Sequence, residues 1–282
     1  MIASEKNTAA YKKVNTIKVA IEKQDRADGS IILYSTIPLE PHAYRLTERL
    51  KHWAAVAPNR IFIGQRSKVP LLTSGGFRRA WDTLTYAETF AKVKSIAQAL
   101  LHKRASSSQP IAILSENSIE HGLLALAAMH IGIPYSAIAP AYSLRSADFD
   151  KLKHVISLLT PGLVFVQDAK KYEKALLAAC KGIEIVSPLN PPPTGGDFRF
   201  THFDELLQTP ATDAVESGFN AVQPQTIAKI LFTSGSTGCR SVSLPTQTSP
   251  RPWIPRMSGS SSVPASSSAT SRPTGSLPRI WR

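Results

Sequence analysis

Between residues 110 and 187, short apolar runs of strand length alternate with segments of helical character. The runs are PIAILS (110–115), PYSAIAP (134–140), GLVFVQ (162–167) and IEIVS (183–187). The segments with the apolar spacing of helices are 118–131, 148–160 and 170–180. Strands that alternate with helices form parallel sheets, because each helical crossover covers one face of the sheet. The sequence therefore predicts an α/β fold with a mostly parallel sheet flanked by helices.

The chain before this alternation predicts a helix, a hairpin and a second helix. One helix face is formed by Leu46, Leu50, Trp53, Ala54 and Ala57, and Pro58 follows it. RIFIGQ (60–65) alternates like a strand, and we expect it to pair with FRRAWDTLT (77–85). Thr85 and Glu88 have the spacing of a capping box at the start of the second helix. The residues that we expect this helix to bury are Phe90, Val93, Ala97, Leu100 and Leu101.

A fifth strand candidate, TIAKILF (226–232), leads into a loop of small hydroxyl residues and glycines. The loop consists of Thr233, Ser234, Gly235, Ser236, Thr237 and Gly238. Glycine permits positive φ, so successive N–H groups can point at one ligand, and the hydroxyls add donors. At the carboxyl end of a strand, such a loop predicts a site for phosphate groups. It is not a Walker A loop, because Cys239 stands where that motif has Lys. A plain Ser/Gly turn or linker is the alternative reading.

The net charge of +13 is unevenly distributed. The last 44 residues hold six Arg and no Lys, Asp or Glu, whereas basic and acidic residues are interspersed in the body. This distribution argues against a nucleic-acid-binding stripe. The sequence has no apolar stretch long enough to span a bilayer, and its first residues lack the apolar centre of a secretion signal. We therefore expect a cytoplasmic protein that does not associate with membranes.

A few further polar residues lie in positions where a site residue could stand. Asn117 is expected to cap the helix that follows it, and His121 to be structural. Tyr142 and Ser143 follow a predicted strand and could approach a substrate pocket. Ser234 does not lie in the G-x-S-x-G pattern of a hydrolase nucleophile. The sequence thus gives no catalytic residue and no metal ligand.

ILFTSGSTG (230–238) resembles the phosphate-binding signature of the adenylate-forming acyl-CoA synthetase (AMP-binding) superfamily. The stretches that resemble the N-terminal part of these enzymes, in the same order, are RLTERLKHWAAVAPNRIFI, LTYAETFAKVKSIAQALL, PIAILSENSIEHGLLALAAMHIGIPYSAIAPAYSL and KLKHVISLLTPGLVFVQD. SENSIEH followed by GIPYSAIAPAYSL is most similar to the feruloyl-CoA synthetase branch. The resemblance covers about residues 40–238.

The resemblance implies a two-step acid–CoA ligase. A carboxylate, such as a ferulate-like hydroxycinnamate, attacks the α-phosphorus of ATP to give an acyl-adenylate and pyrophosphate. Coenzyme A then displaces AMP to give the thioester. In this family the Ser/Thr/Gly loop contacts the β- and γ-phosphates, so residues 233–238 would bind ATP, with Mg²⁺ helping to neutralise its charge. The acid and the oligomeric state stay open.

The chain departs from the family pattern directly after Gly238. The family has Pro and then Lys where this sequence has Arg240 and Ser241. Residues 239–282 hold 12 Ser, 7 Pro and 6 Arg without apolar periodicity, which is typical of disorder. Because the change falls within one motif, we interpret this tail as an out-of-frame product. Truncation after the loop would leave an incomplete, inactive N-terminal domain.

Three regions are therefore expected. They are a flexible leader at 1–30, a partial AMP-binding (adenylation) domain at 31–238, and a disordered Ser/Pro/Arg-rich tail at 239–282. Two alternatives to an inactive ligase fragment remain. One is a non-catalytic remnant that binds ATP or a partner, and the other is an RNA-associating protein that uses its basic tail.

Overall fold

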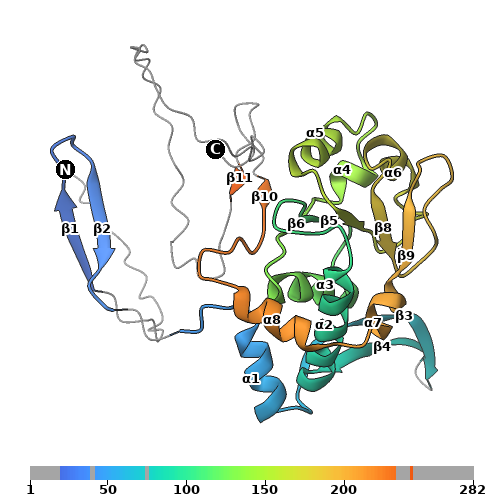
Figure 1. Cartoon of the computed structure of the whole chain (residues 1–282), viewed down its shortest axis with the longest axis horizontal. Coiled ribbons are helices and arrows are strands. Elements are labelled where there is room, and N and C mark those ends of the chain that lie inside the picture. Colours follow the sequence, from blue (N-terminus) through green and yellow to red (C-terminus); the bar gives the residue numbers. More distant parts are fainter. Residues whose placement is uncertain (1–19, 39–41, 74–75, 233–241, 244–282) are drawn as a thin grey trace, which may run out of the picture. The chain divides into compact units, whose positions relative to one another are not determined.

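The computed structural model describes residues 20–38, 42–73, 76–232 and 242–243 of the chain (Figure 1). It divides into two compact units, residues 1–42 and residues 43–282. The remaining residues, which include most of the predicted leader and tail, lie outside the described part.

The first unit contains a hairpin of strands β1 (Ile21–Asp25) and β2 (Ile31–Ser35). Gly29 has a φ of +80° in the turn, and the Asp28 carboxylate accepts from the backbone N–H and the hydroxyl of Ser30. These hydrogen bonds lower the pKa of Asp28. We expected no regular structure for residues 21–30, and the Asp-Gly pair is the turn signal that would have indicated the hairpin.

The second unit is built around a five-stranded sheet with the order β6-β5-β7-β8-β9, in which all neighbours are parallel. Its strands are β5 (Ile111–Ile113), β6 (Tyr135–Ala137), β7 (Leu163–Phe165), β8 (Glu184–Ser187) and β9 (Arg199–His202). The first four confirm the predicted runs and the predicted fold class. The edge strand β9 was not predicted, because two of its four side chains are exposed and its apolar signal is weak.

Helices cover both faces of this sheet, and each face has its own hydrophobic cluster. The helices of unit 2 are α1 (Glu48–Val56), α2 (Tyr86–Leu101), α3 (Ile119–His130), α4 (Ala141–Leu144), α5 (Asp150–Leu159), α6 (Glu173–Ala179), α7 (Phe203–Gln208) and α8 (Asp213–Ala221). Helices α2, α3 and α7 contribute to one cluster, and α5 and α6 to the other. Figure 1 shows the two groups on opposite sides of the strands.

The predicted helix starts are confirmed in one case and corrected in another. Thr85 and Glu88 form the expected capping box at the start of α2. Helix α3 is capped by Ser118, whose hydroxyl accepts from the N–H of His121, and not by Asn117. Helices α7 and α8 were not predicted, although Thr212 caps α8 in the usual way.

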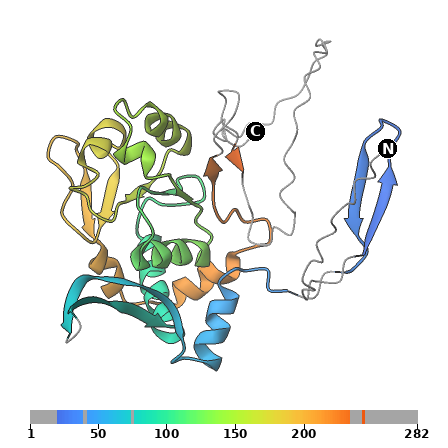
Figure 2. The same ribbon diagram turned by 180° about the vertical axis from the view of Figure 1, so that it is seen from behind.

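Strands β3 (Ile61–Thr73) and β4 (Gly76–Thr85) form the predicted antiparallel hairpin, which is longer than expected. Figure 2 shows this curved hairpin (teal) at the end of the body opposite helix α5. The predicted apolar faces beside it need three corrections, because Leu46, Trp53 and Leu101 are exposed by 51%, 36% and 40%. Leu46 precedes α1, and Leu101 lies at the end of α2.

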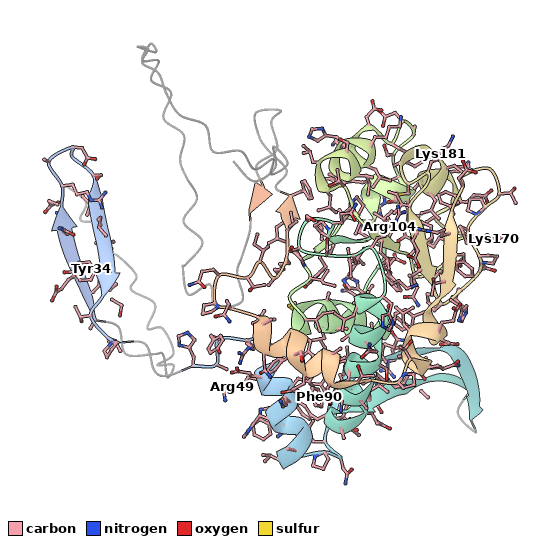
Figure 3. All side chains as sticks on the ribbon, viewed as in Figure 1. Tyr34, Arg49, Phe90, Arg104, Lys170 and Lys181 are labelled. Atoms are coloured by element: carbon pink, nitrogen blue, oxygen red, sulfur yellow. The ribbon has the colours of Figure 1, made fainter. Side chains whose placement is uncertain are left out.

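Three helices meet at His130, the last residue of α3. Its Nδ1 lies 2.9 Å from the hydroxyl of Thr47, and its ring stacks on Phe219 of α8 at 4.6 Å. Phe90 of α2 approaches the same ring edge-on, and Figure 3 shows Phe90 inside the body near α8. The imidazole is fully buried, and burial lowers its pKa to about 4.

This buried histidine should make the stability of unit 2 depend on pH. Below pH 6.5 the unfolded chain binds a proton at His130, whereas the folded chain does so only near pH 4. Stability is therefore fully present above 6.5 and falls as the pH drops toward 4, by up to about 3 kcal/mol. Urea unfolding at a series of pH values in this window measures the loss.

The variant His130→Gln cannot titrate and keeps a polar partner for Thr47, so its unfolding should depend less on pH than that of the parent chain. His154→Gln is the control, because His154 is exposed on α5. Equal pH dependence of the parent chain and His130→Gln would contradict this role of His130.

Candidate functional site

The segment before the predicted phosphate loop lies alongside the edge strand β6. Tyr135 and Lys229 form a parallel bridge, and the N–H of Ile230 donates to the carbonyl of Tyr135 at 2.8 Å. Ile230 is buried in the cluster of α5 and α6. Because the segment runs parallel to β6, it carries the chain toward the edge of the sheet where the parallel strands end.

The predicted fifth strand is corrected in extent. Residues 228–230 follow β6 through only a few hydrogen bonds. Leu231–Phe232 then forms β10, which pairs antiparallel with β11 (Val242–Ser243). Phe232 and Val242, which stand on either side of 233–241 in the sequence, are therefore paired.

The predicted phosphate-binding residues themselves lie outside the described part of the chain. They are Thr233, Ser234, Gly235, Ser236, Thr237 and Gly238. Their role as phosphate ligands therefore stays a prediction.

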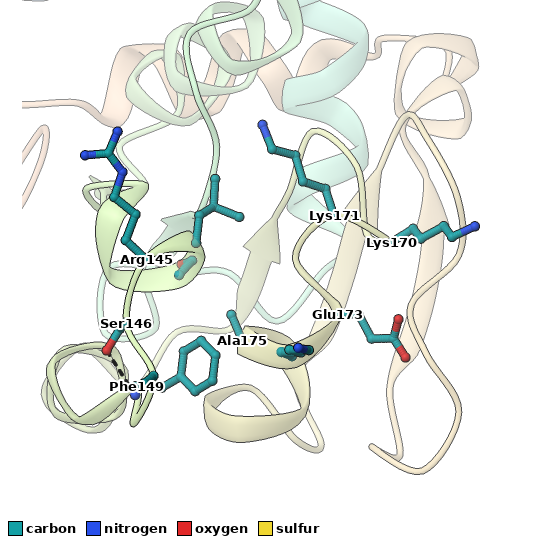
Figure 4. A pocket seen from close by; sticks show the side chains of 11 residues that line it. Arg145, Ser146, Phe149, Lys170, Lys171, Glu173 and Ala175 are labelled. Atoms are coloured by element: carbon teal, nitrogen blue, oxygen red, sulfur yellow. Dashed lines mark hydrogen bonds between the residues drawn. The ribbon is translucent and has the colours of Figure 1, made fainter.

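A cavity of about 620 Å³ opens on the same edge of the sheet, between the loop after β6 and the turn before α6. Figure 4 shows Arg145, at the end of α4, and Lys171 extending in the same direction, with Phe149 and Ala175 between the helices. A hydrogen bond from the N–H of Phe149 to the hydroxyl of Ser146 holds the loop.

The lining of this cavity, called the basic cavity below, is strongly positive. It includes Arg145, Lys170, Lys171 and Lys174, against the single carboxylate of Glu173. Lys171 is paired with Glu116 at 2.6 Å, an ion pair that lowers the pKa of Glu116. The other three cations have no carboxylate within 4 Å among the described residues. Unpaired cations around a hollow attract anions, and phosphate groups are suitable ligands.

Two residues singled out from the sequence lie beside this cavity or nearby. Ser143 lines it, and its buried hydroxyl has no hydrogen-bond partner in the described structure. Tyr142 packs against the cluster of α5 and α6 instead. Nδ1 of His121 faces the carbonyl of Glu116 at 3.3 Å, and its structural role stays a prediction.

Sequence reasoning missed the cationic residues of the basic cavity. Arg145 and Lys174 are 29 positions apart, and nothing in the local sequence links them. The signal that could have found them is topological, because Arg145 follows β6 and Lys174 follows β7, the two strands that flank β5 in the parallel sheet.

The described residues offer neither a metal site nor a membrane span. They contain no group of three or more His, Cys, Asp or Glu side chains placed to hold a metal ion. None of the helices in the described ranges combines the length and the apolar character that crossing a bilayer requires.

A parallel sheet with helices on both faces and ligand groups along its carboxyl edge is the architecture of α/β nucleotide-binding domains. The sequence narrows this class further, since residues 50–239 match the AMP-binding enzyme family. The match covers more than half of the chain, and the chain therefore belongs to the AMP-binding enzymes.

Individual relatives match with low identity and over part of their length. Luciferin 4-monooxygenase of Photinus pyralis is 28% identical over 174 residues, which make up 58% of this chain and 30% of the relative. The polyketide synthase PksN of Bacillus subtilis is 24% identical over 216 residues, or 72% of this chain and 4% of that protein. The chain thus spans less than a third of these relatives.

Solved structures of other proteins have a fold similar to that of this chain. A fatty acyl-adenylate ligase from L. pneumophila, in complex with acyl adenylate and pyrophosphate, has a TM-score of 0.51 at 16% identity, with 73% of this chain and 31% of that chain covered. The A-PCP didomain of a carboxylic acid reductase from Segniliparus rugosus, in complex with AMP, has a TM-score of 0.53 at 15% identity, with coverage of 72% and 32%. At these identities the likeness concerns the fold alone.

The charge of the basic cavity should make it bind small polyanions. We expect inorganic pyrophosphate, titrated by calorimetry, to bind the parent chain and to bind Arg145→Gln/Lys174→Gln at least about tenfold more weakly, since each lost charged contact removes part of the attraction. The double variant Lys181→Gln/Arg199→Gln loses the same charge at exposed positions outside the cavity and should bind like the parent. Equal losses in both double variants would show that net charge alone attracts the anion.

Proposed function

We propose that this chain is part of an ATP-dependent acid–CoA ligase. In the first step a carboxylate oxygen of the acid attacks the α-phosphorus of ATP, and the bond to pyrophosphate breaks. In the second step the thiolate of coenzyme A attacks the acyl carbon, and AMP leaves with its carboxylate-derived oxygen. Membership of the AMP-binding enzymes supports this chemistry.

The observation that carries the proposal is the path of residues 228–232. Hydrogen bonds to Tyr135 hold this segment against β6, and Leu231–Phe232 pairs with Val242–Ser243. Residues 228–232 lead toward the carboxyl edge of the sheet, where ligands of α/β folds bind, and the predicted loop follows them directly in the sequence. Its hydroxyls and glycines suit the β- and γ-phosphates of ATP.

The basic cavity is consistent with a phosphorylated co-substrate. Both ATP and coenzyme A carry several phosphate charges, and the unpaired cations Arg145, Lys170 and Lys174 would attract them. Mg²⁺ would partly neutralise the triphosphate of ATP.

For the acid we propose a hydroxycinnamate of the ferulate type. Support comes from the sequence of residues 115–121 and 132–144, which resembles the feruloyl-CoA synthetase branch. Among proteins of similar fold, one structure contains an acyl adenylate and another a co-purified carboxylic acid. Those ligands belong to the proteins named, and they support a carboxylate substrate in general.

We further propose that a chain with this sequence does not catalyse the ligase reaction. Arg240 and Ser241 occupy the positions of the family's Pro and Lys, so a cation that would face the triphosphate is displaced by one residue. Arg differs from Lys in size and in the geometry of its donors, and a shift of one residue changes its direction as well.

These proposals are tested by measuring ATP binding and AMP formation separately. We expect ATP to bind to the parent chain, and the triple variant Ser234→Ala/Ser236→Ala/Thr237→Val to bind ATP at least about tenfold more weakly, because several hydrogen bonds from hydroxyls to the charged phosphate oxygens are lost. Ferulate, ATP and coenzyme A together should yield no AMP.

The control is Ser107→Ala/Ser108→Ala/Thr194→Val, which removes hydroxyls from exposed loops elsewhere. Absence of ATP binding by the parent chain, or equal binding by the loop variant, would refute the phosphate-binding role. Steady AMP formation that depends on ferulate would refute the proposed lack of turnover and support the ligase chemistry.

A further inference from the structure

A second hollow lies where the connections of the parallel sheet change direction. From β5 the chain passes through α3 to β6 on one side, whereas from β7 it passes through α6 to β8 on the other side. Helix α3 packs in one hydrophobic cluster and α6 in the other, so they cover opposite faces of the sheet (Figure 1). The loops that follow β5 and β7 therefore diverge toward opposite faces of the sheet. Doubly wound folds form ligand crevices at such topological switch points.

The structure has a cavity of about 380 Å³ at this point. Its walls come from the loops after β5 and β7, from strand β3 of the hairpin, and from Leu189 after β8. Gln65 links strand β3 to helix α3, because its Oε1 accepts from the N–H of Ile119 at the start of α3. A hollow of this volume is within the range of small-molecule sites.

Two buried polar atoms at this crevice lack hydrogen-bond partners among the described residues. They are the hydroxyl of Tyr172 and Oε1 of Gln167. Tyr172 is only 1% exposed, and burial raises its pKa to about 12, so the hydroxyl keeps its proton and can donate. Nε2 of Gln167 donates to the carboxylate of Glu120, which orients the amide and leaves Oε1 as a free acceptor. Buried polar groups without partners are costly, and a bound molecule removes that cost.

The charges around the crevice balance, unlike those of the basic cavity. Lys171 is paired with Glu116 at 2.6 Å. Asp168 accepts from Nδ2 of Asn190 at 2.9 Å and from the N–H of Lys170 at 3.0 Å. Arg66 is the second cation of the lining, so two basic and two acidic side chains line the crevice. A charged ligand therefore gains little net electrostatic attraction there. A neutral ligand that offers hydrogen-bond donors and acceptors can still bind to the polar lining.

We propose that this crevice binds an uncharged polyhydroxylated molecule of about the size of a monosaccharide. One ligand hydroxyl donates to Oε1 of Gln167, and another accepts from the hydroxyl of Tyr172. The amide of Asn117, which also lines the crevice, is available to a third hydroxyl. The site is distinct from the predicted phosphate loop and does not depend on the proposed ligase activity.

The test uses myo-inositol and D-ribose as probes in saturation-transfer difference NMR on the full chain, without ATP. We expect a saturable signal from at least one of them below about 100 mM, the range in which a few neutral hydrogen bonds suffice. Raising NaCl from about 0.1 M to about 0.5 M should leave the affinity unchanged, because no net charge is involved.

Tyr172→Phe should weaken binding about fivefold, the effect of one neutral hydrogen bond. Tyr34→Phe is the matched control in the other unit and should bind like the parent. Arg145→Gln/Lys174→Gln should also keep its affinity for the polyol, which separates this site from the basic cavity. Far-UV circular dichroism confirms that each variant is folded.

Two outcomes would overturn the proposal. One is the absence of a saturable signal from both probes in the folded parent chain, which would mean that the crevice holds ordered water only. The other is binding that Tyr172→Phe leaves unchanged or that NaCl abolishes. Loss of ATP binding in the loop variant described above would leave this result unaffected, so the two proposals can fail separately.

Discussion

The burial of strands β5 and β7 on both faces is the constraint on which the rest of the structure depends. Ile111, Ile113, Leu163 and Phe165 belong to one hydrophobic cluster, whereas Ala112 and Val164 between them belong to the other. All six side chains are fully buried. The two strands therefore have no freedom to slide or to turn over without exposing apolar surface. Because they are parallel, the loops that follow them leave from one edge, and both the basic cavity and the crevice between the loops after β5 and β7 lie along that edge.

The sequence predicted this centre well, because a doubly buried strand is a continuous apolar run and its crossover helices have apolar faces. It predicted the periphery less well. Strand β9 exists because Arg199–His202 pairs with β8, and half of its side chains remain exposed. The segment 226–232 is apolar enough for a central strand, but it meets β6 at a single bridge before it pairs with residues 242–243. In both cases the available partner strand, rather than the local sequence, decides where the segment forms a strand.

The same distinction applies to the candidate site. The loop at 233–238 is visible in the sequence because glycines and hydroxyls are contiguous there. The basic cavity and the crevice between the loops after β5 and β7 cannot be recognised in the sequence. Their residues come from segments that only the sheet order β6-β5-β7-β8-β9 brings together. Charge counts along the chain gave scattered Lys and Arg, and the structure sorts these into one hollow with unpaired cations and another with balanced pairs.

Lys171 lines both hollows, and its partner Glu116 lines the neutral one. Both side chains of this pair are about half exposed, at 46% and 63%, so the ion pair contributes little to stability and is easily exchanged. An anion that recruits the ammonium group of Lys171 must compete with Glu116, and it leaves that carboxylate without a counterion at the rim of the neighbouring hollow. An anion in the basic cavity would therefore change the charge at the rim of the crevice through this ion pair.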